Sequence, residues 1–289
     1  MKIPLKTLKN GFSLPLLSMG TWMIGGGVQP DPHCDEDLAI HSIQLGLQNG
    51  LTCIDSAEMY GDGYTEQLIG RAIRDFPREN LQIISKVSPQ NLRYDDVLKA
   101  LEGSLKRLQT DYLDVYLVHK PNSDIPLEET MRAMRHLKDQ GLVRNIGVSN
   151  FSVATLQEAQ NQLGLPIVLN QVHYNLMFRE PELCGLLEYC QQNDIFLMAW
   201  RPLEKGIFAT DCPLILQKIA NKYGKSPAQT AINWLTAQEN VVTLSTMRQA
   251  KNINENIAAV NWTLKNEDIE KLRTVFPGQK KVSNREPLL

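Results

Sequence analysis

Eight short apolar segments recur along the sequence, and each is followed by a stretch in which apolar residues repeat with the period of a helix. Within each segment the apolar residues are continuous, which is typical of parallel strands that are buried on both faces. This repeating strand and helix order predicts an α/β protein built on a parallel sheet. The eight predicted strands are Leu16–Gly20, Leu51–Asp55, Leu81–Val87, Leu113–His119, Arg144–Ser149, Pro166–Val172, Ile195–Trp200 and Val241–Met247.

Eight strands in 289 residues match a closed (β/α)8 TIM barrel in number and length. An open doubly wound sheet is the competing architecture, but no strand is followed by a GxGxxG turn with an acidic ribose ligand downstream, and Gly61–Gly63 is only a short turn. Asn10-Gly11 predicts a β-hairpin that closes the bottom of the barrel. We expect one domain over residues 1–289, with an extra loop near Leu203–Asp211 and an extra C-terminal helix.

Local signals mark several of the predicted helices. Ser226 followed by Pro227 is typical of an N-cap and a first helical position, and Ser152 is a second candidate N-cap. Two stretches with helical spacing predict amphipathic helices. Their apolar residues are Val97, Leu101, Leu105 and Leu108 in the first, and Leu183, Leu186, Leu187 and Cys190 in the second.

Charge and composition argue against several classes of protein. The net charge is -2 and the basic residues are scattered, so no nucleic-acid partner is expected. No apolar run approaches the roughly 18 residues of a membrane span, and no signal peptide is recognisable, so a cytoplasmic protein without a membrane partner is predicted. Five cysteines without a CxxC pair argue against disulfides or structural zinc. The polar run His33–Asp37 predicts a loop before a helix rather than a metal site.

Four chemically active residues fall at the ends of neighbouring predicted strands. Asp55 ends the second strand and Tyr60 follows it in a loop, while Lys86 and His119 lie at the ends of the third and fourth strands. Taken singly, each could have a structural role such as packing or helix capping. In a barrel, however, these strand ends meet on one rim, where barrel enzymes place their chemistry. The four side chains are therefore a candidate active site.

These four groups suit proton transfer to an oxygen atom. Asp55 would pair with Lys86 and hold the ammonium near the Tyr60 hydroxyl. A phenol titrates near ~10, and we expect the cation to lower that pKa and ease proton donation. His119 would orient a substrate oxygen. Such a site could protonate a carbonyl oxygen while a hydride reaches the carbon, and the hydride must come from a cofactor.

Over nearly its whole length the sequence resembles the aldo-keto reductase superfamily, in particular bacterial NADP(H)-dependent oxidoreductases. The matching motifs, in the family's order, are GTW at Gly20–Trp22, IDSAEMYG, SLKRLQTDYLDVYLVHKP, GLVRNIGVSNF, NQVHYNLMFRE, PLEKG, KSPAQTAINWL and INENIAA. The resemblance implies the barrel, reversible NADPH-dependent reduction of aldehyde or ketone carbonyls to alcohols, and a small-molecule carbonyl substrate. It assigns the catalytic tetrad to Asp55, Tyr60, Lys86 and His119, with Tyr60 as general acid and base. A monomer or weak oligomer is expected.

The resemblance also assigns a cofactor site residue by residue. Amide and hydroxyl side chains near the ends of the fifth and sixth strands would hold the nicotinamide carboxamide, an aromatic ring would stack on the nicotinamide, and the eighth strand would lead to the adenosine end. The predicted cofactor residues are Gly20, Thr21, Trp22, Asp55, Ser149, Asn150, Gln171, Trp200, Leu203, Gly206, Thr246, Arg248, Asn252 and Asn256. The predicted substrate pocket contains Trp22, Met23, Met59, Tyr60 and His119.

Two departures from the family pattern and two other functions stay open. Arg201 replaces a common serine and could bind phosphate, bind an anionic substrate or point into solvent. Ser245–Met247 replaces a common PG, but Arg248 keeps a guanidinium suited to a 2′-phosphate, which favours NADP(H) over NAD(H). Lys86 could form a Schiff base in a lyase, although pairing with Asp55 would keep it protonated. A nicotinamide-binding regulatory module with little turnover is the other alternative.

Overall fold

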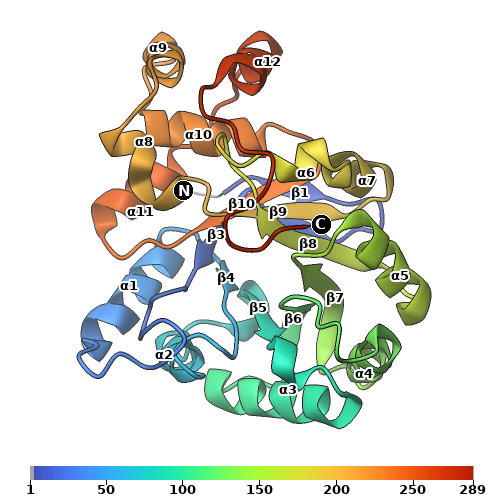
Figure 1. Ribbon diagram of the computed structural model, residues 1–289. Coiled ribbons are helices and arrows are strands. Elements are labelled where there is room, and N and C mark those ends of the chain that lie inside the picture. Colours follow the sequence, from blue (N-terminus) through green and yellow to red (C-terminus); the bar gives the residue numbers. More distant parts are fainter. Residues whose placement is uncertain (1–2, 289) are drawn as a thin grey trace.

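Eight parallel strands close into a barrel (Figure 1). The computed structural model describes residues 3–288. Each strand pairs with the next along the chain, and the last pairs with the first, which confirms the TIM barrel and rules out the open sheet. Every strand overlaps a predicted segment. The strands are β3 Leu17–Gly20, β4 Cys53–Asp55, β5 Gln82–Val87, β6 Leu113–Val118, β7 Val143–Ser149, β8 Ile167–His173, β9 Phe196–Trp200 and β10 Val241–Ser245.

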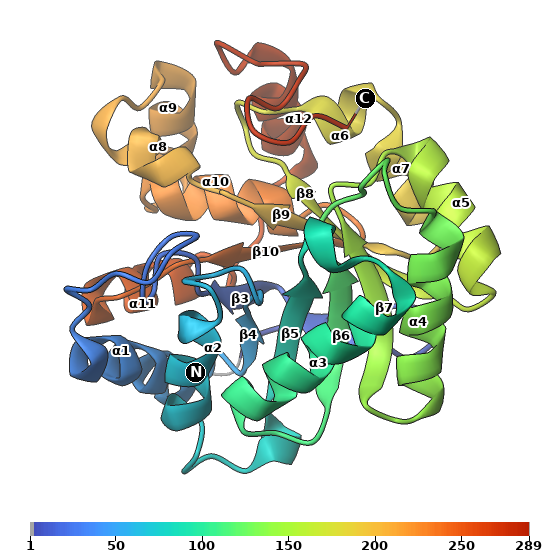
Figure 2. The same ribbon diagram turned by 60° about the horizontal axis from the view of Figure 1, so that its bottom comes forward.

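Helices surround the barrel on its outside (Figures 1 and 2). They bury the outward side chains of the strands, so the barrel wall is covered on both faces, as continuous apolar strands require. The α-helices are α1 Glu36–Gln48, α2 Tyr64–Ala72, α3 Tyr94–Leu108, α4 Leu127–Asp139, α5 Val153–Leu163, α6 Glu180–Leu183, α7 Leu186–Gln192, α8 Ile207–Thr210, α9 Leu214–Lys222, α10 Pro227–Thr236, α11 Ala250–Ile257 and α12 Asn266–Val275. Three short 3-10 helices are η1 Arg78–Asn80, η2 Pro89–Asn91 and η3 Glu204–Gly206.

The predicted helix starts are confirmed. Ser226 caps α10 by accepting a hydrogen bond from the Gln229 backbone, and the Gln229 side chain returns one to the Ser226 backbone, both at 3.1 Å. Ser152 caps α5 in the same position. Along α3, the apolar spacing predicted for that helix lies on its buried face.

Two predictions of local structure are wrong. The apolar residues from Leu183 to Cys190 do not form one helix, because Gly185 adopts a left-handed conformation (φ 78°) that separates α6 from α7 and leaves Leu183 exposed. The extra segment after β9, predicted as a loop, is largely helical and contains η3 and α8.

The N-terminal hairpin closes the bottom of the barrel, as predicted. Strands β1 Leu5–Thr7 and β2 Ser13–Pro15 pair antiparallel around a turn with Gly11 at φ 88°. Leu8 and Leu14 pack with the side chains of the barrel interior, so the hairpin acts as a plug at the end opposite the strand C-termini.

The C-terminal residues return to the mouth of the barrel. After α12, the predicted extra helix, the chain runs beside the segment that follows β8, where the Lys280 backbone donates to the Met177 carbonyl at 2.6 Å. In Figure 1 this tail crosses in front of the strands and ends over β8 and β9. Among the described helices, none combines the length and apolarity that crossing a bilayer requires.

Candidate active site

Alternation along the strands points the predicted catalytic side chains into the barrel. Asp55, Lys86 and His119 lie at or directly after the ends of β4, β5 and β6. Each stands two positions after a residue whose side chain packs inside the barrel. Because strand side chains alternate between the two faces, both members of each pair face the interior, with the polar one nearer the C-terminal rim. The pairs are Cys53 and Asp55, Ile84 and Lys86, and Leu117 and His119.

Lys86 joins two of the predicted site residues, Asp55 and Tyr60. Its ammonium is fully buried and donates to Asp55 Oδ2 at 2.8 Å, to the Ser56 carbonyl at 2.6 Å and to the Tyr60 hydroxyl at 3.3 Å. Burial disfavours the charge, but the Asp55 carboxylate and Tyr60 outweigh it and raise the pKa of Lys86. Lys86 therefore stays an ammonium ion held between the carboxylate and the phenol.

Tyr60 is kept protonated by its surroundings. Its ring packs edge-on against Trp22, with centroids 4.9 Å apart. Burial raises the pKa of the Tyr60 hydroxyl, and the charge and hydrogen bond of Lys86 oppose this only in part. Lys86 lowers this pKa as predicted, but the cost of burying a phenolate is larger, so the net pKa lies above its usual value instead of below it. The hydroxyl is in the form that a proton donor needs.

His119 faces Tyr60 as a neutral imidazole. The two rings meet edge-on with centroids 5.9 Å apart. Burial, together with the positive charges of Lys86 and Lys120, lowers the pKa of His119 to about 3. Its Nδ1 is buried and has no hydrogen-bond partner among residues 3–288. A buried acceptor without a donor costs less than a buried N–H without an acceptor, so the ring proton belongs on Nε2, where it can be donated to a ligand.

The amide and hydroxyl residues predicted for the carboxamide lie together near the C-terminal ends of β7 and β8. Gln171 connects them to the tetrad, because its Nε2 donates to Asp55 Oδ1 at 2.7 Å. Ser149 Oγ donates to the Gln171 carbonyl at 2.8 Å, and Asn150 Nδ2 donates to Ser149 Oγ at 3.0 Å. The hydrogen bonds of the Gln171 amide use its nitrogen, which leaves the amide oxygen for a ligand.

Trp200, the predicted stacking residue, ends β9 beside this group. Its indole N–H donates to Asn150 Oδ1 at 3.3 Å. One face of the indole is covered by the ring of His173, at a centroid distance of 4.1 Å and an interplanar angle of 7°. The indole is thus held rigidly in one plane at the rim, as a platform for a planar ring must be.

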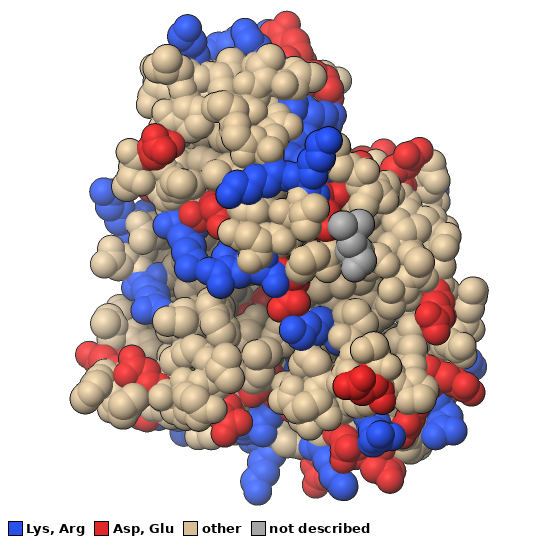
Figure 3. All heavy atoms as spheres, viewed as in Figure 1, with Lys and Arg blue, Asp and Glu red and all other residues tan. Residues whose placement is uncertain are grey.

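The residues predicted for the adenosine end lie where β3 and β10 run side by side. Thr246 Oγ1 donates to the Trp22 carbonyl at 3.5 Å, and Arg248 donates to the Met23 carbonyl. Asn256 Nδ2 donates to Ser245 Oγ at 3.3 Å, whereas Asn252 is exposed on α11. Figure 3 shows Lys and Arg side chains gathered across the middle of this face, which suits an anionic ligand.

The other predicted residues also border the mouth. Gly20 ends β3 beside Leu244, and Thr21 Oγ1 donates to the Asp55 carbonyl at 2.8 Å. Leu203 precedes η3 and Gly206 is its last residue, and Met59 is half-buried in the turn before Tyr60. The side chain of Arg201, whose direction the sequence left open, lies 3.8 Å from Glu204 Oε1 and near the Trp200 ring.

Sequence reasoning missed a second polar group beside the tetrad. His173 and Asn175 are both hydrogen-bonded to the Glu204 carboxylate, and none of the three was predicted to belong to the site. The strand pattern contained a signal for His173, because it stands two positions after Gln171 on the same strand and therefore shares its face. Asn175 lies in a loop and Glu204 in the three-residue η3, and neither segment has a periodicity that assigns a direction to a side chain.

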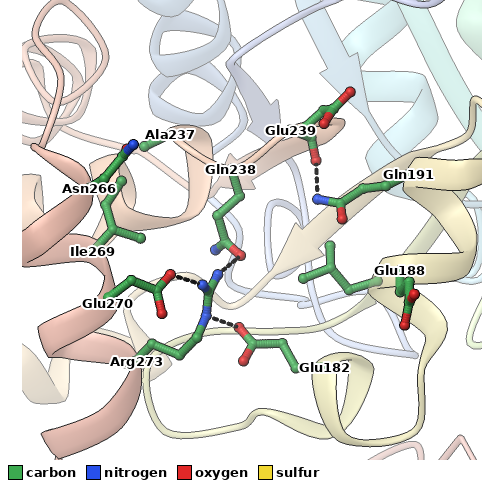
Figure 4. A pocket seen from close by; sticks show the side chains of 11 residues that line it. Glu182, Glu188, Gln191, Ala237, Gln238, Glu239, Asn266, Ile269, Glu270 and Arg273 are labelled. Atoms are coloured by element: carbon green, nitrogen blue, oxygen red, sulfur yellow. Dashed lines mark hydrogen bonds and ion pairs between the residues drawn. The ribbon is translucent and has the colours of Figure 1, made fainter.

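A surface pocket of about 390 Å³ between α7, α10 and α12 contains none of the predicted site residues (Figure 4). Arg273 lies within it and is paired with Glu182 and Glu270 and hydrogen-bonded to Gln238. The charge of Arg273 is therefore already neutralised by carboxylates. The predicted catalytic residues lie at the mouth of the barrel and not in this pocket.

Comparison with known proteins agrees with this fold. Residues 16–276 match the model of the aldo/keto reductase family. The chain is 34% identical to methylglyoxal reductase YeaE of Escherichia coli (strain K12) over 93% of each chain. A crystal structure of the thermostable aldo-keto reductase Tm1743 with the inhibitor epalrestat has a TM-score of 0.90 and 44% identity, covering 93% of this chain and 98% of that one. A Klebsiella pneumoniae aldo/keto reductase bound to NADP and acetate has a TM-score of 0.84 and 31% identity over the full length of both. The chain belongs to the aldo/keto reductase family of oxidoreductases.

Proposed function

We propose that this protein reduces aldehyde or ketone carbonyls to alcohols with NADPH, reversibly, and that Tyr60 donates the proton. The observation that carries the proposal is the position of the Lys86 ammonium, which lies 2.8 Å from Asp55 Oδ2 and 3.3 Å from the Tyr60 hydroxyl. A relative crystallised with NADP supports the choice of cofactor. Location in the cytoplasm and the oligomeric state stay predictions.

The residues at the rim fit a nicotinamide cofactor. Ser149, Asn150 and Gln171 offer the donors and acceptors that a carboxamide needs, and Trp200 offers a fixed aromatic surface. Arg248 would hold the 2′-phosphate. When bound there, the reduced nicotinamide supplies the hydride, a function that no side chain can perform.

The protein's own groups handle the carbonyl oxygen. His119 Nε2–H donates to that oxygen and orients it. The Tyr60 hydroxyl gives its proton to the same oxygen as negative charge develops there. Lys86 then donates to the phenolate and stabilises it, while Asp55 keeps Lys86 in place. In the reverse direction the phenolate takes the proton back from the alcohol.

The experiment that tests this function is a carbonyl panel followed by loss of NADPH absorbance. Methylglyoxal belongs in the panel because a relative is named a methylglyoxal reductase, and an aromatic aldehyde and a cyclic ketone extend it. Tight NADPH binding without turnover of any carbonyl would favour the regulatory module instead. A borohydride-trapped adduct on Lys86 would favour the lyase, although its pairing with Asp55 opposes this chemistry.

Arg248 should discriminate between the two nicotinamide cofactors. We expect Arg248→Ala to raise the Kd of NADPH by about 10-fold to 100-fold and to change the Kd of NADH by less than about threefold, because only NADPH carries the 2′-phosphate. Fluorescence titration measures both constants. Lys251→Ala, an exposed cation on α11, is the matched control. An equal loss for both cofactors would place the 2′-phosphate elsewhere.

Carbonyl reduction should be insensitive to pH over a wide range. We expect kcat at saturating NADPH to be constant from about pH 6 to about pH 9. Tyr60 acts in its protonated form, and because its pKa is raised, that form persists as the pH rises through this range. His119, with a pKa of about 3, stays neutral as the pH falls. A single ionisation that abolishes kcat between pH 6 and 9, with the fold intact by circular dichroism, would contradict this assignment.

A further inference from the structure

His173 lies at the junction of three segments around the barrel mouth. The side chain is buried and sandwiched between Trp200, at 4.1 Å, and Phe178, at 4.2 Å between ring centroids. Its Nε2 lies 2.9 Å from Glu204 Oε2 in the segment after β9, and its Nδ1 lies 2.8 Å from Ser283 Oγ in the C-terminal tail. The His173 ring therefore contacts Trp200, the η3 segment and the C-terminal tail.

The hydrogen bonds of Ser283 favour one direction for its contact with His173. The Ser283 hydroxyl oxygen accepts from the backbone N–H groups of Arg285 and Glu286, both at 3.2 Å, so its two lone pairs are used and its proton goes to His173 Nδ1. The ring proton then lies on Nε2 and is donated to the Glu204 carboxylate. Burial lowers the pKa of His173, and Glu204 opposes this in part, so the ring is neutral as this pattern requires.

The Glu204 contact holds a segment with an unusual backbone. Arg201, Glu204 and Lys205 all have positive φ angles, of 57°, 42° and 59°, which non-glycine residues adopt at a cost. Asn175 Nδ2 stabilises the segment by donating to the Arg201 carbonyl at 2.9 Å and to Glu204 Oε2 at 3.0 Å. The conformation of residues 201–206 therefore depends on contacts with the residues after β8.

The tail is fixed by a buried carboxylate as well as by His173. Glu180 accepts the Ser283 N–H at 2.7 Å on Oε2 and the Leu288 N–H at 2.9 Å on Oε1. Lys120, which follows His119 in the chain, pairs with Glu286 at 3.2 Å. The tail is thus positioned directly beside the candidate active site.

We propose that His173 is a positioning residue that couples the 201–206 segment to the tail 280–288 and sets the plane of Trp200. The proposal rests on the function proposed above, in which residues 201–206 border the cofactor and the tail borders the substrate. In this proposal a cofactor that contacts residues 201–206 restrains Glu204, and through His173 and Ser283 it restrains the tail. The cofactor thereby prepares the substrate side of the site.

Limited trypsin digestion tests the coupling without using turnover. The tail carries exposed cleavage sites at Lys280, Lys281 and Arg285. We expect NADPH to slow their cleavage by about fivefold or more in the wild-type protein, and to have no effect in His173→Phe, which keeps an aromatic ring but loses both hydrogen bonds. His41→Phe, an exposed histidine on α1, is the control and should behave as wild type. Equal NADPH protection in wild type and His173→Phe would overturn the proposal.

A double-variant cycle tests the path through Ser283. Ser283→Ala removes the contact with His173 and the two hydrogen bonds that Ser283 accepts within the tail, but it leaves the His173–Glu204 contact in place. We therefore expect it to raise the KM of the carbonyl substrate by about fivefold while the Kd of NADPH stays within about twofold. Added to His173→Phe, it should have no further effect. Additive effects would show that the tail is held independently of His173.

NADPH binding separates failure of this proposal from failure of the proposed function. If only the coupling is absent, the wild-type protein still binds NADPH. If the wild-type protein does not bind NADPH at all, the proposed function itself is wrong.

Discussion

Tyr60→Phe is expected to lower the kcat of carbonyl reduction by about 10³-fold and to leave the Kd of NADPH within about twofold of the wild-type value. The substitution removes one hydroxyl and keeps the ring that packs against Trp22 and His119. Lys86 retains its contacts with Asp55 and the Ser56 carbonyl, so the ion pair should survive. Stopped-flow measurement of NADPH oxidation gives the rate of the chemical step, and fluorescence titration gives the Kd.

The matched control for this variant is Tyr223→Phe. Tyr223 also donates a hydrogen bond to a carboxylate, Asp268 Oδ2 at 2.5 Å, but it lies at the end of α9, away from the barrel mouth. It should leave kcat unchanged. Turnover in Tyr60→Phe that matched this control would assign the proton donor to another group, with His119 as the next candidate.

Lys86→Met is expected to abolish measurable turnover and to lower the free energy of unfolding by about 3–5 kcal/mol. Both Lys86 and Asp55 are buried, so removing the ammonium leaves a carboxylate without its counter-ion in a region of low polarity. The Tyr60 phenolate would also lose the donor that stabilises it. Urea denaturation measures the change in stability, and the NADPH assay measures the activity.

A second substitution separates the two effects of Lys86→Met. In Lys86→Met/Asp55→Asn the buried charge is gone, and the asparagine oxygen can still accept from Gln171 Nε2. We expect this double variant to regain about half of the lost stability and none of the activity. Recovery of turnover would mean that the ammonium is dispensable. If Lys86→Met alone were as stable as the wild type, the buried Asp55 carboxylate would not need the Lys86 counter-ion for stability.

Much of the fold and of the candidate site followed from local patterns. Strand side chains alternate regularly, so residues such as Lys86 and Gln171, placed two positions after an interior residue, had to face the barrel interior once the strands were recognised. The C-terminal ends of neighbouring parallel strands necessarily meet on one rim. Convergence of Asp55, Lys86 and His119 was therefore predictable before any coordinates.

The direction of the Tyr60 pKa was not predictable in this way. The sequence indicated which cation would lie near the phenol, and an ammonium alone favours the phenolate. How deeply the hydroxyl is buried depends on the packing of Trp22 and of the loops around it, and that burial outweighs the charge of Lys86. The pKa of Tyr60 reflects two opposing effects, burial of the hydroxyl and the charge of Lys86. Only the charge could be recognised in the sequence.

The strand order, the rim and the identity of the four reactive groups were determined by the sequence, because each depends on periodicity within a short segment. The contact of His173 with Glu204 and Ser283 joins residues 31 and 110 positions apart. Ser283 lies outside any strand or helix, and Glu204 lies in the three-residue η3, which is too short to give a periodic signal in the sequence. Such contacts arise only when the loops after β8 and β9 and the C-terminal tail are folded against one another, since hydrogen bonding between irregular segments follows from their three-dimensional placement.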